Sequence, residues 1–381
     1  MPNKETLTAT FKEGLEEIVA ATSAICFIDG LRGKLIYRGY DIHELAEYST
    51  FEETVLLLWN GTLPTRTRLT TFSAQLLENR ELPDYVYSAL RSSTKSAHPM
   101  AVLRSAVSLL GLSDPEAEDN SPEANKRKGL RLVARIPTIV ATYHRLRKGL
   151  SPISHSASLG HAGNFLYMLT GTKPDKRAER IFDICLILHA DHEFNASTFT
   201  GRVTASTLSD IYSAVTSAIG ALKGPLHGGA NESVMKMLLE IGEISNVDSY
   251  IRNALSAKKK ISGFGHRVYK TEDPRAAVLR KISKELGERS GNLRWYEMSM
   301  KIEDLMQKEK SLYPNVDFYS ASVYYELGIP IDLFTPVFAI SRISGWTAHI
   351  LEQYAHNRLI RPLAEYTGPL DLQYDPIDKR S

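Results

Sequence analysis

Two histidines of this chain lie in glycine-rich turns beside basic residues, a setting that suits catalysis. His227 lies in KGPLHGGANE, where Pro225 and Gly228-Gly229 end one helix before the periodic run VMKMLLEIG starts the next. Because the positive end of a helix dipole opposes protonation, we expect a neutral imidazole that donates one hydrogen bond, which suits polarising a carbonyl. His266 lies in SGFGHRVYKTEDPRA, where two glycines let the backbone approach a ligand.

Further polar residues stand in breaker-rich or apolar segments. Asp317 falls between Pro314-Asn315 and a new helical run, so its carboxylate is either a base or a helix cap. Arg342 interrupts the apolar run FAISRISGW and needs an anionic partner, from the protein or from a ligand. The full candidate set comprises His192, His227, His266, Arg275, Asp317, Arg342 and Arg361.

This set favours enolate chemistry on a small polycarboxylate. Arginines bind carboxylates bidentately, so three of them suit a dicarboxylate or a tricarboxylate. A carboxylate base that faces a neutral histidine suits removal of a proton next to a carbonyl. No nucleophile motif of the G-x-S-x-G kind is present.

Two other kinds of site were weighed. His189 and His192 share a helix face beside Asp191, which suggests a metal hydrolase, but the H-E-x-x-H order is absent and no metal site is predicted. GFGHRV has two glycines of a dinucleotide fingerprint, but Val268 stands in the third glycine's place and helical segments surround the motif. We therefore reject the dinucleotide interpretation.

The elements that must position these residues are almost all helical. AICFIDG and KLIYRGY read as two strands that join at Gly30 to Gly33. Capping residues are expected at Asp41 and Thr50, and SPISHSASLGHAGNF is expected to be a loop with exposed histidines at 155 and 161. Helices are predicted near 11–20, 65–79, 84–91, 99–110, 125–149, 175–192, 208–222, 247–257, 274–286 and 295–309.

Composition excludes several classes of protein. With 381 residues, 43% hydrophobic and 24% charged, the chain is an ordinary globular protein with a large core. A net charge of +2 argues against bulk binding to nucleic acid or membrane. Two cysteines without a CxxC pair, and no leader-like or membrane-spanning run, favour a reducing cytoplasm.

Five long motifs resemble the citrate synthase family, and the resemblance covers essentially the whole chain in matching order. The resemblance implies an all-α, two-domain helical fold with a small N-terminal β-hairpin. We place the large domain at 1–220 plus 320–381, and the small, mobile, CoA-side domain at 221–319. The motifs are GPLHGGANE, GFGHRVYKTEDPRA, PNVDFYSASVYY, LFTPVFAISRISGWTAHILEQ and NRLIRPLAEYTGP.

The resemblance also implies roles for individual residues. Asp317 would remove a methyl proton of acetyl-CoA, His227 would donate to the thioester oxygen, and His266 would polarise the ketone of oxaloacetate. No cofactor is implied beyond the coenzyme A thioester, which is a substrate. Oxaloacetate would be held by His192, Arg275, Arg342 and, from the other subunit of a homodimer, Arg361. Coenzyme A would be held by Gly263, Phe264, Gly265 and Lys270.

Besides the metal hydrolase, two alternatives stay open at this point. A 2-methylcitrate synthase would use propionyl-CoA, and an extra methylene changes binding by only about 1 to 3 kcal/mol. A catalytically silent homologue would lack turnover, although the catalytic residues are intact. The position two after Arg361 is often basic in the family, and Leu363 occupies it here.

Overall fold

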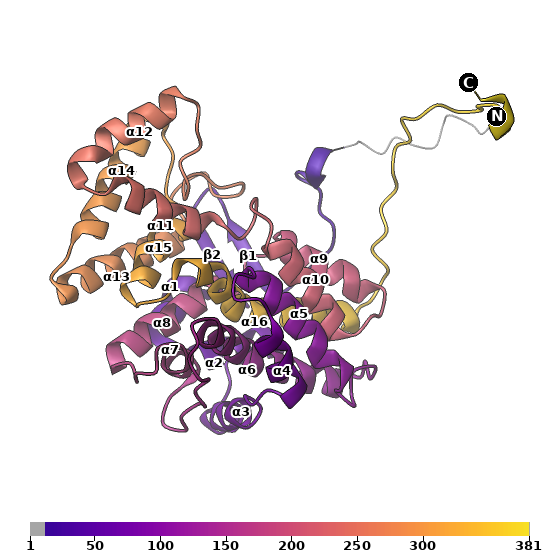
Figure 1. Ribbon diagram of the computed structural model, residues 1–381, viewed down its shortest axis with the longest axis horizontal. Coiled ribbons are helices and arrows are strands. Elements are labelled where there is room, and N and C mark those ends of the chain that lie inside the picture. The colour runs from indigo at the N-terminus through magenta and orange to yellow at the C-terminus, as the bar shows by residue number, and fades with distance from the viewer. Residues whose placement is uncertain (1–11, 381) are drawn as a thin grey trace.

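The computed structural model describes residues 12–380, which are almost entirely helical (Figure 1). Within this range the chain forms sixteen α-helices and one three-stranded antiparallel sheet, so the predicted all-α fold with a small N-terminal hairpin is confirmed. The first eight helices are α1 (Ile42–Tyr48), α2 (Phe51–Asn60), α3 (Arg66–Glu78), α4 (Asp84–Ser92), α5 (Pro99–Leu112), α6 (Pro122–Arg147), α7 (His161–Thr170) and α8 (Lys176–His189). The others are α9 (Ala196–Ser206), α10 (Ile211–Leu222), α11 (Ala230–Ile241), α12 (Val247–Ser256), α13 (Pro274–Ser290), α14 (Arg294–Lys310), α15 (Val316–Glu326) and α16 (Phe334–Ala355). Short 3₁₀ turns lie at Glu13–Leu15, Ile244–Asn246, Ile331–Leu333 and Ile377–Lys379.

The N-terminal hairpin pairs β1 (Cys26–Asp29) with β2 (Lys34–Tyr37) in antiparallel register, with Ile28 opposite Leu35. These two side chains point to the core and are buried, as the period of two in a strand requires. A third short strand, β3 (Tyr40–Asp41), extends the sheet beyond the two predicted strands.

The predicted start and stop residues set the helix ends near the hairpin. The Asp41 carboxylate accepts the backbone N–H of His43 and caps α1, and the Thr50 hydroxyl accepts that of Glu53 and caps α2. Each cap satisfies an N–H that the helix itself cannot pair. Helix α2 then stops at Gly61, whose φ of 80° is the left-handed conformation that glycine adopts without strain.

Helix α16 forms the centre of the core. It packs against α2, α6, α8, α9 and α10, and it is buried from Phe334 through Ile350. Since an apolar helix is buried on all sides only inside a large protein, its polar residues need partners within the structure. Arg342 is one of these buried polar residues.

Helices α11 to α15 pack mainly among themselves. The pairs α13 with α15, α11 with α15 and α12 with α14 are in contact, and Figure 1 shows this group on the left of the molecule, beside the hairpin. The small domain predicted at 221–319 falls largely on these helices, and its boundaries stay a prediction.

Three expectations about local structure were wrong. The described part of the first predicted helix, residues 12–20, holds only the 3₁₀ turn Glu13–Leu15; Phe11 lies outside the described residues. Helices α7 and α9 were missed: the serines and glycine of SPISHSASLG before α7 read as loop, and α9 begins directly after the polar turn DHEFN. His161 is the first residue of α7 and is buried, whereas exposure was expected.

Beyond α16 the chain leaves the body. Residues 361–380 are all exposed, and Figure 1 shows the C-terminal segment running outward from the body of the molecule. No helix among the described residues combines the length and the apolar composition needed to cross a bilayer.

Candidate active site

Six of the seven predicted acid-base and arginine residues come together in one place. The imidazole rings of His192 and His266 lie with centroids 5.1 Å apart. Burial lowers the pKa of His192 well below its usual value, and Arg275, His266, Arg342 and His227 lower that pKa further, in that order. The charges that act on Asp317 include Arg275 and Arg342. Segments more than 100 residues apart in sequence therefore form one site.

His227 is held as a neutral imidazole with a defined tautomer. Its Nε2 lies 3.2 Å from the backbone nitrogen of Ser197 in the first turn of α9. A backbone N–H can only donate, so Nε2 accepts and Nδ1 carries the proton. Burial first, and then Arg342, lowers the pKa of His227 to about 4. His227 precedes α11 as predicted, but burial and Arg342 keep it neutral.

His266 has the opposite tautomer. Its Nδ1 accepts the backbone N–H groups of Val268, at 3.0 Å, and Tyr269, at 3.1 Å. Nε2 therefore carries the proton of the neutral ring and is free to donate. Burial, followed by Arg275, lowers the pKa of His266 to about 4. The two histidines thus offer one N–H each to the site.

Asp317 lies in the first turn of α15 and is not its cap. The cap is Asn315, whose side-chain oxygen accepts the backbone N–H of Asp317 at 3.0 Å. Burial raises the pKa of the Asp317 carboxyl to about 6, while Arg275 opposes this rise. At pH 7 the group is ionised and close to the basicity that suits a general base. The helix-cap interpretation of Asp317 is wrong.

Arg275 is buried and already paired with Asp273. Its Nε and Nη2 donate to the two Asp273 carboxylate oxygens at 2.9 and 2.7 Å. The same carboxylate caps α13 and accepts the N–H of Val316 at the start of α15. Among the described residues Nη1 has no hydrogen-bond partner, so this nitrogen is the one left for an anionic ligand.

Arg342 projects from buried helix α16 toward the same place. Its Nε donates to the backbone oxygen of His189 at 2.8 Å, and its guanidinium lies 4.6 Å from the ring centroid of Phe338. Burial lowers the pKa of Arg342 even though Asp191 opposes this effect. Within residues 12–380 neither terminal nitrogen of Arg342 is hydrogen bonded, which leaves both for a carboxylate.

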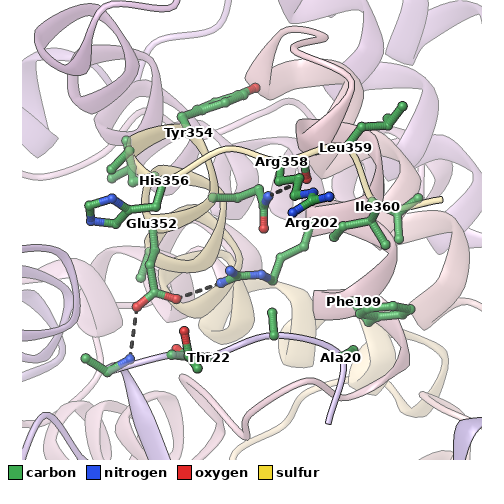
Figure 2. A pocket seen from close by; sticks show the side chains of 18 of the residues that line it. Ala20, Thr22, Phe199, Arg202, Glu352, Tyr354, His356, Arg358, Leu359 and Ile360 are labelled. Carbon is green, nitrogen blue, oxygen red and sulfur yellow. Dashed lines mark hydrogen bonds and ion pairs between the residues drawn. The ribbon is translucent and has the colours of Figure 1, made fainter. Parts of the chain in front are cut away.

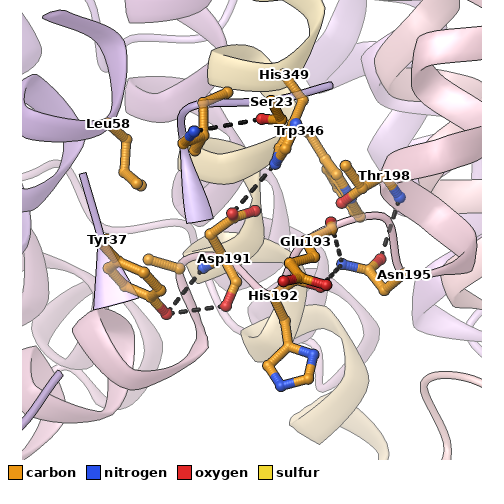
Figure 3. A network of polar contacts seen from close by, with 12 residues as sticks. Ser23, Tyr37, Leu58, Asp191, His192, Glu193, Asn195, Thr198, Trp346 and His349 are labelled. Carbon is orange, nitrogen blue, oxygen red and sulfur yellow. Dashed lines mark hydrogen bonds and ion pairs between the residues drawn. The ribbon is translucent and has the colours of Figure 1, made fainter. Parts of the chain in front are cut away.

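The turn between α8 and α9 carries His192 (Figure 3). Nε2 of His192 is buried and has no hydrogen-bond partner in the described part of the chain. Figure 3 shows its ring pointing away from the Asp191 carboxylate, which lies 3.1 Å from Nε2 of His349. The Nδ1 of His189 donates to the Cys185 oxygen at 2.8 Å. These three side chains do not converge as metal ligands would, and residues 12–380 contain no group of three or more side chains able to hold a metal ion.

The predicted coenzyme A loop lies against the start of α15. Gly263 and Gly265 have φ of 83° and 80°, and between them the ring of Phe264 packs edge-on against the ring of Phe318, with centroids 4.6 Å apart. Asn315 ties the loop to the helix, since its backbone N–H donates to Gly263 and its side chain donates to Gly265, at 2.9 and 3.0 Å. The loop and Asp317 are therefore positioned by one residue.

Two predicted residues stay at the surface. Lys270 is exposed, yet close enough to His266 to lower the pKa of that ring. Arg361 is exposed in the segment that leaves the body after α16. It lines an open groove of about 1630 Å³, and the structure does not bring it to the six residues of its own chain.

Sequence reasoning missed Ser197, the residue that fixes the tautomer of His227. Ser197 accepts a hydrogen bond from Nε1 of Trp346 at 3.1 Å, and its hydroxyl donates to Asn195 at 2.8 Å. Asn195 in turn caps α9. The signal was an asparagine before ASTFTG, which reads as a helix cap, but nothing in the sequence indicates that His227 lies beside it.

Comparison with known proteins was made on the whole chain. A family model described as "Citrate synthase, C-terminal domain" matches residues 14–363. The chain is 55% identical to citrate synthase 2 of Bacillus subtilis, over 98% of this chain and 100% of that protein. It is 44% identical to 2-methylcitrate synthase 2 of Corynebacterium glutamicum, over 98% of this chain and 99% of that one. A solved structure of citrate synthase from Thermoplasma acidophilum, in a ternary complex with carboxymethyl coenzyme A and oxaloacetate, superposes with a TM-score of 0.92 at 34% identity, over 97% and 100% of the two chains. The chain therefore belongs to the citrate synthase family and is an enzyme.

Proposed function

We propose that this enzyme condenses acetyl-CoA with oxaloacetate and hydrolyses the resulting citryl-CoA to citrate and CoA, the reaction that feeds the tricarboxylic acid cycle. The observation that carries the proposal is the pairing of a carboxyl of pKa about 6, Asp317, with two neutral histidines that donate from opposite tautomers. Such a set removes a proton beside one carbonyl and polarises another.

In the first step Asp317 takes a proton from the methyl group of the thioester. The Nδ1–H of His227 donates to the thioester oxygen, where negative charge develops as the enol forms. A neutral donor suits this task, because the pKa of His227 near 4 keeps the ring uncharged at pH 7.

In the second step the enol carbon attacks the ketone of oxaloacetate. The Nε2–H of His266 polarises that ketone and gives its proton to the new alkoxide. Arg342 and Nη1 of Arg275 bind the substrate carboxylates, and His192 offers its unpaired nitrogen. Water then cleaves the thioester of citryl-CoA and releases free CoA as a thiol.

Coenzyme A is placed against the loop of Gly263, Phe264 and Gly265. Backbone with left-handed glycines can approach an adenine closely, and exposed Lys270 suits a phosphate. The segment 221–319 would rotate over the substrates and exclude water. Cys26 and Cys185 are both unpaired thiols, which is consistent with a cytoplasmic enzyme.

We further propose a homodimer in which Arg361 completes the site of the partner subunit. Arg361 is exposed on a segment that also leaves Leu359, Leu363 and Tyr366 largely exposed. Figure 2 shows the groove from which this segment departs, where Arg202 and Glu352 pair between α9 and α16. A second copy packed there would bury these apolar side chains.

The substrate test is thiol release from purified protein given oxaloacetate with acetyl-CoA or with propionyl-CoA, followed with a chromogenic disulfide. We expect acetyl-CoA to be preferred. A higher kcat/KM with propionyl-CoA would move the assignment to 2-methylcitrate synthesis, which the similarity to the Corynebacterium enzyme makes the second candidate. No release with either thioester would contradict both.

The rate is expected to fall in acid because Asp317 must be ionised to act as the base. With a pKa of about 6 for Asp317, kcat/KM for oxaloacetate should fall about tenfold per pH unit below pH 6. His227 and His266, with pKa values of about 4, stay neutral in this range and should add no second limb above pH 5. A profile that is flat between pH 7 and pH 5, with the fold intact by circular dichroism, would contradict the role of Asp317.

A further inference from the structure

The N-terminal hairpin, residues 26–37, touches both segments that carry the substrate-facing histidines. At its tip the backbone oxygen of Gly30 accepts the N–H of Lys270 at 2.8 Å. Lys270 lies four residues after His266. The bond also spans the boundary predicted between the large and small domains.

This bond continues the hydrogen bonding that fixes His266. Three successive backbone N–H groups donate to these two partners. Those of Val268 and Tyr269 donate to Nδ1 of His266, and that of Lys270 donates to the backbone oxygen of Gly30. The short stretch 268–270 is thus held between the imidazole and the hairpin tip. If the hairpin tip moved, either the imidazole of His266 would move with it, or the hydrogen bonds that keep the proton on Nε2 would be lost.

The tip fits against this stretch so closely that only glycine is tolerated there. A Cβ at Gly30 would lie 2.1 Å from the backbone oxygen of Val268. A Cβ at Gly33, where φ is 61°, would lie 2.8 Å from the backbone oxygen of Glu272. Both obstacles are backbone atoms, which no side-chain rotation can clear.

The body of the hairpin holds the turn of His192 in the same way. The N–H of Ile28 donates to the Glu193 carboxylate at 2.9 Å. The Tyr37 hydroxyl donates to the backbone oxygen of Asp191 at 2.9 Å and accepts its N–H at 3.1 Å, as Figure 3 shows. His192 lies between the two anchored residues.

We propose that the hairpin is a positioning element that sets His192 and His266 relative to each other, through the bond of Gly30 to Lys270 and the bond of Ile28 to Glu193. Neither Gly30 nor Glu193 is among the residues proposed to bind substrate. The proposal rests on the proposed function, since the roles of the two histidines come from it.

The first test is Gly30→Ala. A Cβ at 2.1 Å from the Val268 oxygen forces that oxygen to withdraw by more than about 1 Å before ordinary contact is restored, and a misplacement of about 1 Å can already cost on the order of 100-fold in rate. We expect kcat/KM for oxaloacetate to fall by about that factor, and the infrared stretching frequency of the bound oxaloacetate ketone to move back toward its value in water. The matched control is Gly220→Ala in α10, where the nearest atom to a new Cβ is 3.9 Å away.

The second test compares Glu193→Ala with Glu193→Gln and decides the matter if Gly30→Ala fails to fold. Loss of one hydrogen bond to a charged acceptor should raise the KM for oxaloacetate about tenfold in Glu193→Ala. Glutamine keeps an oxygen for the N–H of Ile28 and should restore most of the affinity. A merely structural role would lower the unfolding temperature and leave the ketone frequency unchanged.

The outcomes separate the two proposals. A wild-type protein without thiol release refutes the proposed function itself. An active wild type overturns the positioning role if folded Gly30→Ala keeps both its rate and its ketone frequency, or if Glu193→Gln binds oxaloacetate no better than Glu193→Ala.

Discussion

Replacing Asp317 with asparagine is expected to lower kcat by about 10²-fold to 10⁴-fold, the range that a general base supplies. The amide is the same size as the carboxylate but cannot accept the methyl proton. Oxaloacetate should still bind, because the groups proposed to hold it, Arg342, His192 and Arg275, are unchanged. Turnover is measured by thiol release, and oxaloacetate binding by calorimetry on the same preparation.

Asp317→Asn should change the activity without changing the stability of α15. Asn315 is the cap of α15, so Asp317→Asn removes no capping bond and should leave the unfolding temperature close to that of the wild type. Asp304→Asn, on an exposed face of α14, is the matched control and should be fully active. If Asp317→Asn keeps wild-type turnover, another group is the base and the proposed mechanism fails.

Local signals made much of the fold predictable. Capping side chains at Asp41 and Thr50, proline at the start of α5 and α13, and glycine at the end of α2 act over three or four residues, so a sequence shows them directly. The hairpin was equally legible, because strand period and turn glycines lie within fifteen residues. Helices α7 and α9 were not, since their first residues resemble a loop until tertiary contacts bury them.

The members of the site were predictable, but their states were not. Glycine-rich turns and an arginine in an apolar helix single out His227, His266 and Arg342. The tautomer of His227 depends on Ser197, which lies 30 residues away. Among the described residues, Nη1 of Arg275 is left without a partner because Asp273 binds Nε and Nη2. Protonation states and hydrogen-bond partners of this kind are set only when separate helices pack together, so a local sequence pattern does not predict them.

The burial of His161 also could not be predicted from the local sequence. A histidine among serines and glycines reads as exposed, yet its backbone N–H donates to the Glu52 carboxylate and its ring meets the Arg80 guanidinium, with 3.2 Å between the nitrogens. All three residues are buried. The backbone N–H and the Nδ1 of His161 are hydrogen bonded to partners from α2 and from the segment that follows α3, and the sequence does not link these segments to His161.

Arg361→Ala is expected to abolish most activity of the proposed homodimer, and co-expression with Asp317→Asn is expected to restore part of it. If Arg361 acts across the subunit interface, a mixed dimer has one site with both Asp317 and the partner's Arg361 intact, and one site with neither. Random pairing makes half of the dimers mixed, so co-expressed variants should show about a quarter of wild-type activity while each alone is nearly inactive. Thiol release on the co-purified mixture gives the number.

The mixing experiment discriminates because the two geometries predict opposite results. If Arg361 served the site of its own chain, each site of a mixed dimer would lack one of the two groups, and mixing would restore nothing. Arg361 is exposed and lies apart from the six site residues of its own chain, which favours a role in the site of the partner subunit. Leu363→Ala, two residues along the same exposed segment, is the control that removes an apolar contact without removing a charge. Full activity of Arg361→Ala alone, in a protein that sediments as a dimer, would exclude any role for this arginine at the site.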